Sequence, residues 1–154
     1  AYPHTARLGK LPNTDYYRNI DRFPEAADRK DALVFRFDAQ LYFANIQYFK
    51  DRLQQLILDK GDDLKVIVIN AQSIHNLDSS AVNGLRDLID ELNGKGIAFY
   101  MTEVIGPVRD VLKRTGLLEK IGPHHIHMRV HDALKHYDEQ SQGDNRYAIQ
   151  TNVD

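Results

Sequence analysis

Residues 66–92, VIVINAQSIHNLDSSAVNGLRDLIDEL, contain the pattern that decides the fold class. Residues 66–69 form a continuous run of branched apolar side chains, which is typical of a strand buried on both faces of a parallel sheet. After a short polar loop, apolar residues recur every three or four positions, at Ala81, Val82, Leu85, Leu88, Ile89 and Leu92. A buried strand followed by an amphipathic helix predicts a crossover unit of an α/β sheet.

The same alternation extends in both directions along the chain. Strands are predicted at residues 6–11, 33–37, 97–101 and within 121–128, and helices at 44–60, from about Pro107 to Gly116, and at about 131–140. The strands at 6–11 and 33–37 both precede the first helix, so one of the two could pair antiparallel at an edge. The polar residues 13–30 are predicted to cross the surface. We therefore predict one α/β domain over residues 6–138, with a mixed, mostly parallel sheet of about five strands and about four helices. Residues 139–154 are predicted to be a polar flexible tail.

The composition is that of one ordinary globular domain. The chain has 154 residues, 42% of them hydrophobic and 27% charged, with a formal net charge of -2. Near-balanced charge gives no general attraction to nucleic acid, and the lack of cysteine excludes disulfides, thiolate zinc sites and cysteine nucleophiles. No run approaches the roughly 18 apolar residues of a membrane span. Because the first residue is Ala1, we expect a processed product or a fragment of a longer protein.

The loop before the second predicted helix holds the main candidate residues, Asp78, Ser79, Ser80 and Ala81. Asp78 or Ser79 can cap the helix by accepting hydrogen bonds from its free N–H groups, and spacing alone favours this simple role. The same N–H groups favour anions, so a phosphate on Ser80, a nucleotide or a free anion could also be held there. A hydrolase triad of Ser80 with His75 and Asp78 is excluded, because the glycines of a nucleophile elbow are absent.

A second candidate is the histidine cluster of His124, His125 and His127. On a strand, His125 and His127 would point to the same face, where imidazoles can bind zinc or nickel. The cluster contains no acidic partner, so we predict surface histidines and no functional metal. Phosphate-binding loops and paired catalytic carboxylates are also absent, so we predict no cofactor and no catalytic residue.

The three large apolar residues at 41–43, Leu41, Tyr42 and Phe43, cannot all face one core. We predict that two are buried and one covers the loop. The alternative is an exposed docking patch.

Several segments resemble the STAS domain of SulP-type anion transporters. They are residues 8–15 (LGKLPNTD), 17–19 (YRN), 23–26 (FPEA) and 35–45 (FRFDAQLYFAN). Residues 77–81 (LDSSA) match the Asp-Ser-Ser/Thr loop found across STAS domains. The resemblance spans about residues 6–137.

This resemblance implies a STAS-like fold and a non-catalytic regulatory and interaction domain of a transporter for sulfate, bicarbonate or a related anion. Residues 1–5 would be a linker from a many-helix membrane domain, and the domain would lie on the cytoplasmic face of the bacterial inner membrane. Expected partners are that membrane domain, a cytoplasmic regulatory protein and a second copy of the domain, with no nucleic acid. Docking is expected at Asp78, Ser79, Ser80, Ala81 and the following helix.

A second branch of the superfamily contains soluble anti-sigma-factor antagonists, which are switched off when the second serine of Asp-Ser-Ser-Gly is phosphorylated. That position is Ser80 here, but Ala81 replaces the glycine that follows it. The departure and the segment at 35–45 favour the transporter branch. A free-standing phospho-switch acting through Ser80 is the alternative function.

Overall fold

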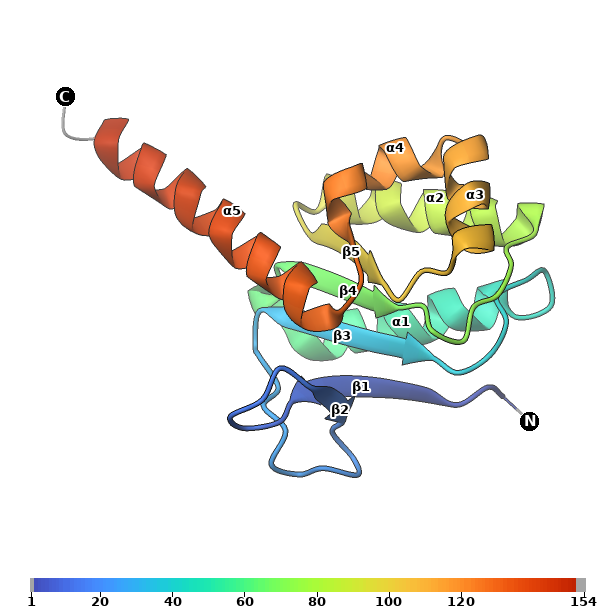
Figure 1. The fold of residues 1–154 in the computed structure, drawn as a ribbon, viewed down its shortest axis with the longest axis horizontal. Helices are drawn as coiled ribbons and strands as arrows, with labels where there is room; N and C mark the ends of the chain where they lie inside the picture. Colours follow the sequence, from blue (N-terminus) through green and yellow to red (C-terminus); the bar gives the residue numbers. More distant parts are fainter. Residues whose placement is uncertain (1, 152–154) are drawn as a thin grey trace.

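A six-stranded mixed sheet forms the centre of the protein, in the order β2-β1-β3-β4-β5-β6 (Figure 1). The computed structural model describes residues 2–151, and the side chains of residues 2–143. The parallel strands are β3 (Ala32–Phe37), β4 (Val66–Asn70), β5 (Ala98–Thr102) and β6 (Ile126–His127). Strand β1 (Thr5–Lys10) runs antiparallel to β3, and β2 (Tyr17–Asn19) runs antiparallel to β1. The predicted α/β class with a mixed, mostly parallel sheet is confirmed.

Helices cover both faces of this sheet. The first face carries α1 (Ile46–Lys60), α2 (Ser79–Gly94), α3 (Gly106–Arg114) and α4 (Leu117–Ile121), whose apolar residues share one buried cluster with Phe35, Ile67 and Ile69. The second face carries α5 (Val130–Thr151), whose first turns pack on Val34, Val68 and Tyr100. Figure 1 shows α5 crossing the sheet and extending beyond it. Short 3-10 turns, η1 (Gly61–Asp63) and η2 (Pro123–His125), complete the described elements.

Strand β4 and helix α2 follow the sequence pattern closely. All five residues of β4 are buried, because α2 and α5 cover opposite faces of the sheet at its centre. Helix α2 buries the whole predicted apolar stripe. Burial of apolar surface contributes about 25 cal/mol for each Å² removed from water, so the buried residues of these two elements stabilise the fold.

The structure adds elements that the sequence did not predict. Strand β2 lies within the predicted surface excursion at 13–30, and the rest of this segment packs on the domain through a pair of backbone hydrogen bonds between Lys10 and Ala27, at 3.1 and 2.8 Å. Helix α4 occupies residues 117–121, and the last strand is only the two residues of β6. The predicted strand within 121–128 is therefore too long at its start, because Leu117 and Ile121, four positions apart, are buried on one side of a single helical turn.

The two ends of the chain also differ from the predicted organisation. The predicted helix end near Gln140 is wrong, because α5 continues to Thr151, and residues 152–154 lie outside the described residues. At the other end, Thr5 already belongs to β1, and the His4 ring lies 2.6 Å from a carboxylate oxygen of Asp38. The domain boundaries at residues 6 and 138 stay predictions.

Candidate functional site

Asp78 caps the N-terminus of α2. Its Oδ1 atom accepts a hydrogen bond from the Ala81 N–H at 2.8 Å, which confirms the predicted cap. Ser79 is exposed at the first helical position, Ser80 is half-buried at the second, and the Ala81 side chain is fully buried. A partner at this surface can therefore reach the side chains of Ser79 and Ser80, whereas Ala81 faces the core.

The same carboxylate joins α2 to the loop that follows β3. The Oδ2 atom of Asp78 accepts a hydrogen bond from the Phe43 N–H at 2.9 Å, so the two oxygens serve two different segments. Leu41 and Leu77 form an isolated parallel bridge beside it, and the His75 N–H donates to Oε1 of Gln40 at 3.0 Å. Residues 40–45 and 75–80 are thereby fixed to each other as one surface.

Tyr42 and Phe43 project from this surface. Leu41 is 1% exposed, Tyr42 is 42% exposed and Phe43 is 72% exposed, so the prediction that two of the three are buried is wrong. The physical reason is the entry into α1. The N–H groups of Asn45 and Ile46 donate to the Tyr42 carbonyl, which turns the chain away from the core directly after Leu41. The exposed patch that we gave as the alternative is the arrangement found.

A cavity of about 800 Å³ is lined by Asp78 and Tyr42. Its lining combines the loop after β3 with Tyr48 of α1 and with Tyr2 and Pro3 at the start of the chain. The rings of Tyr2 and Tyr48 stack with 4.6 Å between their centroids. Sequence reasoning missed Tyr2 and Tyr48, because only the fold brings residues 46 positions apart into contact. Figure 1 shows that the N-terminus lies at the end of the sheet to which β3 and β4 point.

The histidine cluster is packed around a buried tyrosine. The His125 ring stacks on Tyr100 at 4.1 Å, and its Nδ1 atom lies 2.9 Å from the Phe99 carbonyl oxygen. Nδ1 of His136, on α5, lies 2.7 Å from the Tyr100 hydroxyl, and the His127 ring lies 5.3 Å from the His136 ring. His125 belongs to η2 and precedes β6, so it does not share a strand with His127 as predicted.

This packing also sets the electrostatics of the cluster. Burial and the neighbouring imidazoles lower the pKa of His136, and burial raises the pKa of Tyr100 to about 12. Within the part of the chain that the structure describes, no three His, Cys, Asp or Glu side chains are placed to share a metal ion. No helix among those residues is long and apolar enough to cross a membrane.

Comparison with known proteins places the chain in a family. The model of the STAS domain matches residues 23–133. The chain belongs to the STAS domain family. A relative in Arabidopsis thaliana, named "Probable sulfate transporter 4.2", is 38% identical over 144 residues, which cover 88% of this chain and 21% of that protein. The chain therefore spans about a fifth of the length of this relative.

Solved structures agree on the STAS fold. The murine anion transporter Slc26a9 superposes with a TM-score of 0.82 at 17% identity, over 90% of this chain and 22% of that one. A Thermotoga maritima protein described as "a putative anti-sigma factor antagonist" superposes with a TM-score of 0.62 at 18% identity, over 71% of this chain and 90% of that one. At these identities, the two superpositions show the fold alone. The resemblance to STAS domains of anion transporters is confirmed by the family match and by the sulfate transporter relative.

Proposed function

We propose that this STAS domain is a non-catalytic regulatory and interaction domain of a sulfate-type anion transporter. The observation that carries the proposal is its 38% identity, across nearly the whole chain, to a protein named as a sulfate transporter. In this arrangement the domain lies on the cytoplasmic face of the membrane. The membrane-spanning part of the same transporter is its first partner, and a cytoplasmic regulatory protein or a second copy are further partners.

Docking is proposed at the surface formed by Tyr42, Phe43, Asp78, Ser79 and Ser80, which we call the docking surface. Exposed aromatic rings are frequent anchors of protein interfaces, because they bury a large apolar area with few rotatable bonds. Here the backbone beneath Phe43 is held by Asp78, so little conformational entropy remains to be lost on binding. Pro3 and Tyr2 line the adjoining cavity, so the N-terminal segment lies beside the docking surface.

The proposal is tested by Phe43→Ser in the complete gene that encodes this chain, with radiolabelled sulfate uptake as the readout. We expect uptake to fall by about ten-fold or more, because truncation of a central aromatic anchor removes about 2 kcal/mol or more of binding energy. The matched control is Leu58→Ser on α1, since Leu58 is also strongly exposed, at 80% against 72% for Phe43. Equal uptake in both variants and the wild type would place docking elsewhere.

A second function is favoured by one observation: Ser80 lies at the second position of α2 in a fold shared with an anti-sigma factor antagonist. A phosphate on Ser80 would add about -1.5 to -2 charges beside Asp78 and repel an acidic partner surface. Phosphopeptide mapping of protein isolated from its native cells tests whether Ser80 is phosphorylated. Modification that is lost in Ser80→Ala and kept in Ser79→Ala supports this second function, and a Ser80 that is unmodified under every growth condition overturns it.

A further inference from the structure

One row of residues, made of one residue from each of three neighbouring strands, is polar, whereas the preceding row on the same face of the sheet is apolar. Arg36, Asn70 and Thr102 are paired in register across β3, β4 and β5. Two residues earlier on each strand, the same face carries Val34, Val68 and Tyr100 beneath α5. Asn70 and Thr102, at 6% and 0% exposure, are two of the three buried polar residues among those the structure describes. Burial of polar groups is costly unless they are hydrogen-bonded. Here Arg36 bonds Asp38, Asn70 accepts from Gln72 and Thr102 donates to Glu103, and no buried side-chain nitrogen or oxygen among the described residues lacks a partner.

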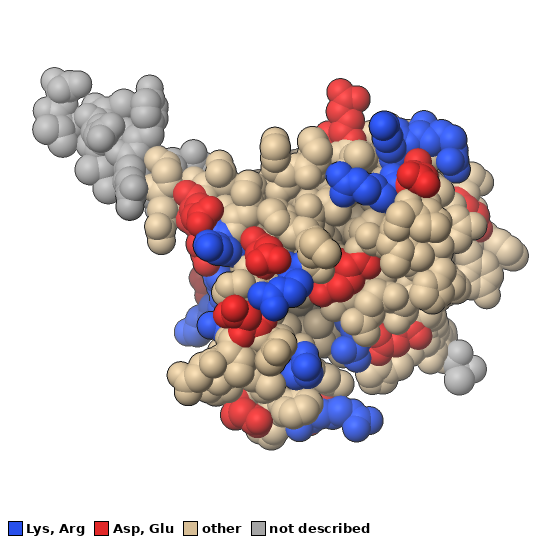
Figure 2. Space-filling view, viewed as in Figure 1, with Lys and Arg blue, Asp and Glu red and all other residues tan. Residues whose placement is uncertain are grey.

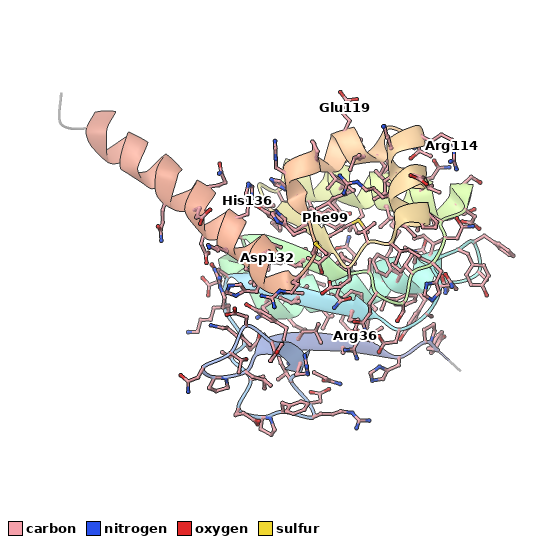
Figure 3. All side chains as sticks on the ribbon, viewed as in Figure 1. Arg36, Phe99, Arg114, Glu119, Asp132 and His136 are labelled. Carbon is pink, nitrogen blue, oxygen red and sulfur yellow. The ribbon has the colours of Figure 1, made fainter. Side chains whose placement is uncertain are left out.

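A polar cavity of about 380 Å³ lies over Arg36 and Asn70 of this row, at the carboxyl ends of the parallel strands. Ligands in open α/β sheets bind at such ends. The walls come from the loop between β1 and β2, from Glu103 after β5, and from Arg129 and Val130 at the start of α5. Figure 2 shows acidic and basic side chains intermingled around the base of α5, and Figure 3 labels Arg36 on the sheet and Asp132 on the first turn of α5.

The hydrogen-bond donors of this cavity are only partly used. Oδ1 of Asn70 accepts from the Gln72 N–H at 3.0 Å, but its Nδ2 group donates to no residue that the structure describes. The Arg129 guanidinium forms ion pairs with Asp15 at 3.6 Å and with Asp132 at 3.8 Å, and both distances are too long for hydrogen bonds, so its N–H groups can still donate to a ligand. The helix dipole of α5 adds partial positive charge at Val130. These groups can bind the oxygens of an anion.

The cavity also contains an acceptor, the carboxylate of Glu103. This carboxylate accepts a hydrogen bond from the Thr102 hydroxyl, and Glu103 has a φ of 53°, in the left-handed region that residues other than glycine rarely adopt. The cavity is lined by the cations Arg18, Arg36 and Arg129 and by the anions Asp15 and Glu103, with Asp38 paired to Arg36. Positive and negative charges nearly balance, so net charge alone does not select a ligand here. The ligand must offer oxygens to Arg129 and Asn70 and a proton to Glu103.

We propose that this cavity binds a small oxyanion that carries a proton, either hydrogen phosphate or bicarbonate. Near neutral pH both ions have a hydroxyl that can donate to Glu103, whereas sulfate has none. Sulfate would therefore place an oxygen lone pair against a carboxylate lone pair. This site is separate from the docking surface, and its test does not depend on the proposed transporter function.

The test is a nuclear magnetic resonance titration of the 15N-labelled chain with sodium phosphate, sodium bicarbonate or sodium sulfate, at one near-neutral pH and one ionic strength. We expect saturable shifts of the Asn70 side-chain amide and of the Gln72 and Thr102 backbone amides with phosphate or bicarbonate. Sulfate should bind at least about ten-fold more weakly, because one repulsive contact of about 1.4 kcal/mol has this effect. The ion that saturates at the lower concentration identifies the ligand.

Two variants separate this site from general ion effects. Arg129→Gln should weaken phosphate or bicarbonate binding by about ten-fold, while Arg114→Gln, which removes the same charge at the exposed end of α3, should leave it unchanged. Glu103→Gln supplies an amide donor and should raise the sulfate affinity by about ten-fold. Shifts that do not saturate, that sodium chloride reproduces, or that persist in Arg129→Gln overturn the proposal.

Discussion

At the scale of single residues, Gly84 determines how closely α1 and α2 approach. A Cβ atom at this position would lie 2.5 Å from Cγ1 of Ile46 and 2.9 Å from its Cδ1. Because α1 and α2 share one buried cluster, neither helix can move away without losing apolar contacts. Gly84→Ala is therefore expected to reduce the free energy of unfolding by about 1–3 kcal/mol, as overpacking of a core does. Urea unfolding of the chain measures the loss.

Two further variants check that the clash with Ile46 is the cause. Gly94→Ala, at the other end of α2, has no atom within 4 Å of the added Cβ, so stability should stay equal or rise by up to about 1 kcal/mol. Ile46→Ala removes the clashing atoms, so the double variant should be more stable than the sum of the two single effects. Strictly additive effects would show that Gly84 has another role.

At the scale of elements, Asp78 connects the start of α2 to the loop that leads from β3 into α1. Asp78→Ala should lower the free energy of unfolding by about 1–2 kcal/mol, because it removes the cap and leaves the Phe43 N–H without its acceptor. Asp78→Ser keeps a capping oxygen for Ala81 but has none for Phe43. Hydrogen exchange should therefore be faster at the Phe43 amide in both variants, and faster at Ala81 only in Asp78→Ala. Unchanged exchange at Phe43 would contradict the connection.

The elements that sequence could predict are those with a long apolar repeat. The strand at Val66–Asn70 and the helix at Ser79–Gly94 bury unbroken patterns, so their type follows from the sequence. Strand β2 has three residues and α4 has five, and such short segments show no period of their own. They form because β1 and α3 lie beside them.

The features of the candidate site also divide into those that follow from the local sequence and those that depend on the fold. The cap at Asp78 is local and was predictable, whereas the exposure of Tyr42 and Phe43 depends on the turn into α1. The contact of Tyr2 with Tyr48 and the row of Arg36, Asn70 and Thr102 depend on the register of distant strands. No spacing along the chain encodes those contacts.

At the scale of the whole molecule, pH couples the attachment of α5 to overall stability. The pKa of His136 is lowered from 6.5 by burial and by the facing imidazoles of His125, His127 and His124, against a smaller opposite effect of Glu139 on α5. Above about pH 6.5, His136 is neutral in both the folded and the unfolded chain. As the pH falls below 6.5, the unfolded chain binds a proton before the folded protein does. The free energy of unfolding must therefore decrease in that range.

Other groups act in different pH windows. The hydrogen bond from Arg29 lowers the pKa of Asp31 below 3.8. Burial tends to raise the pKa of Asp38, but the hydrogen bonds and charges of Arg36 and His4 outweigh it and hold that pKa below 3.8 as well. The stabilisation from both groups is lost only as the pH falls through that region. The contribution of Glu103 to stability changes with pH in the opposite direction. Burial raises its pKa above 4.5, so its stabilisation is present below pH 4.5 and is lost as the pH rises from 4.5 through that raised pKa. A loss of stability that begins near pH 6.5 as the pH is lowered therefore indicates the histidine cluster and not the carboxylates.

His136→Gln tests this assignment, because glutamine does not titrate and its amide can still bond the Tyr100 hydroxyl. Thermal unfolding between about pH 8 and pH 5 should show a smaller fall in the midpoint temperature for this variant than for the wild-type chain. His75→Gln removes an exposed imidazole on the loop before α2 and should keep the wild-type slope. If His136→Gln keeps that slope as well, proton uptake at the base of α5 is not what weakens the fold, and the buried contact between Tyr100 and α5 would be insensitive to pH in this range.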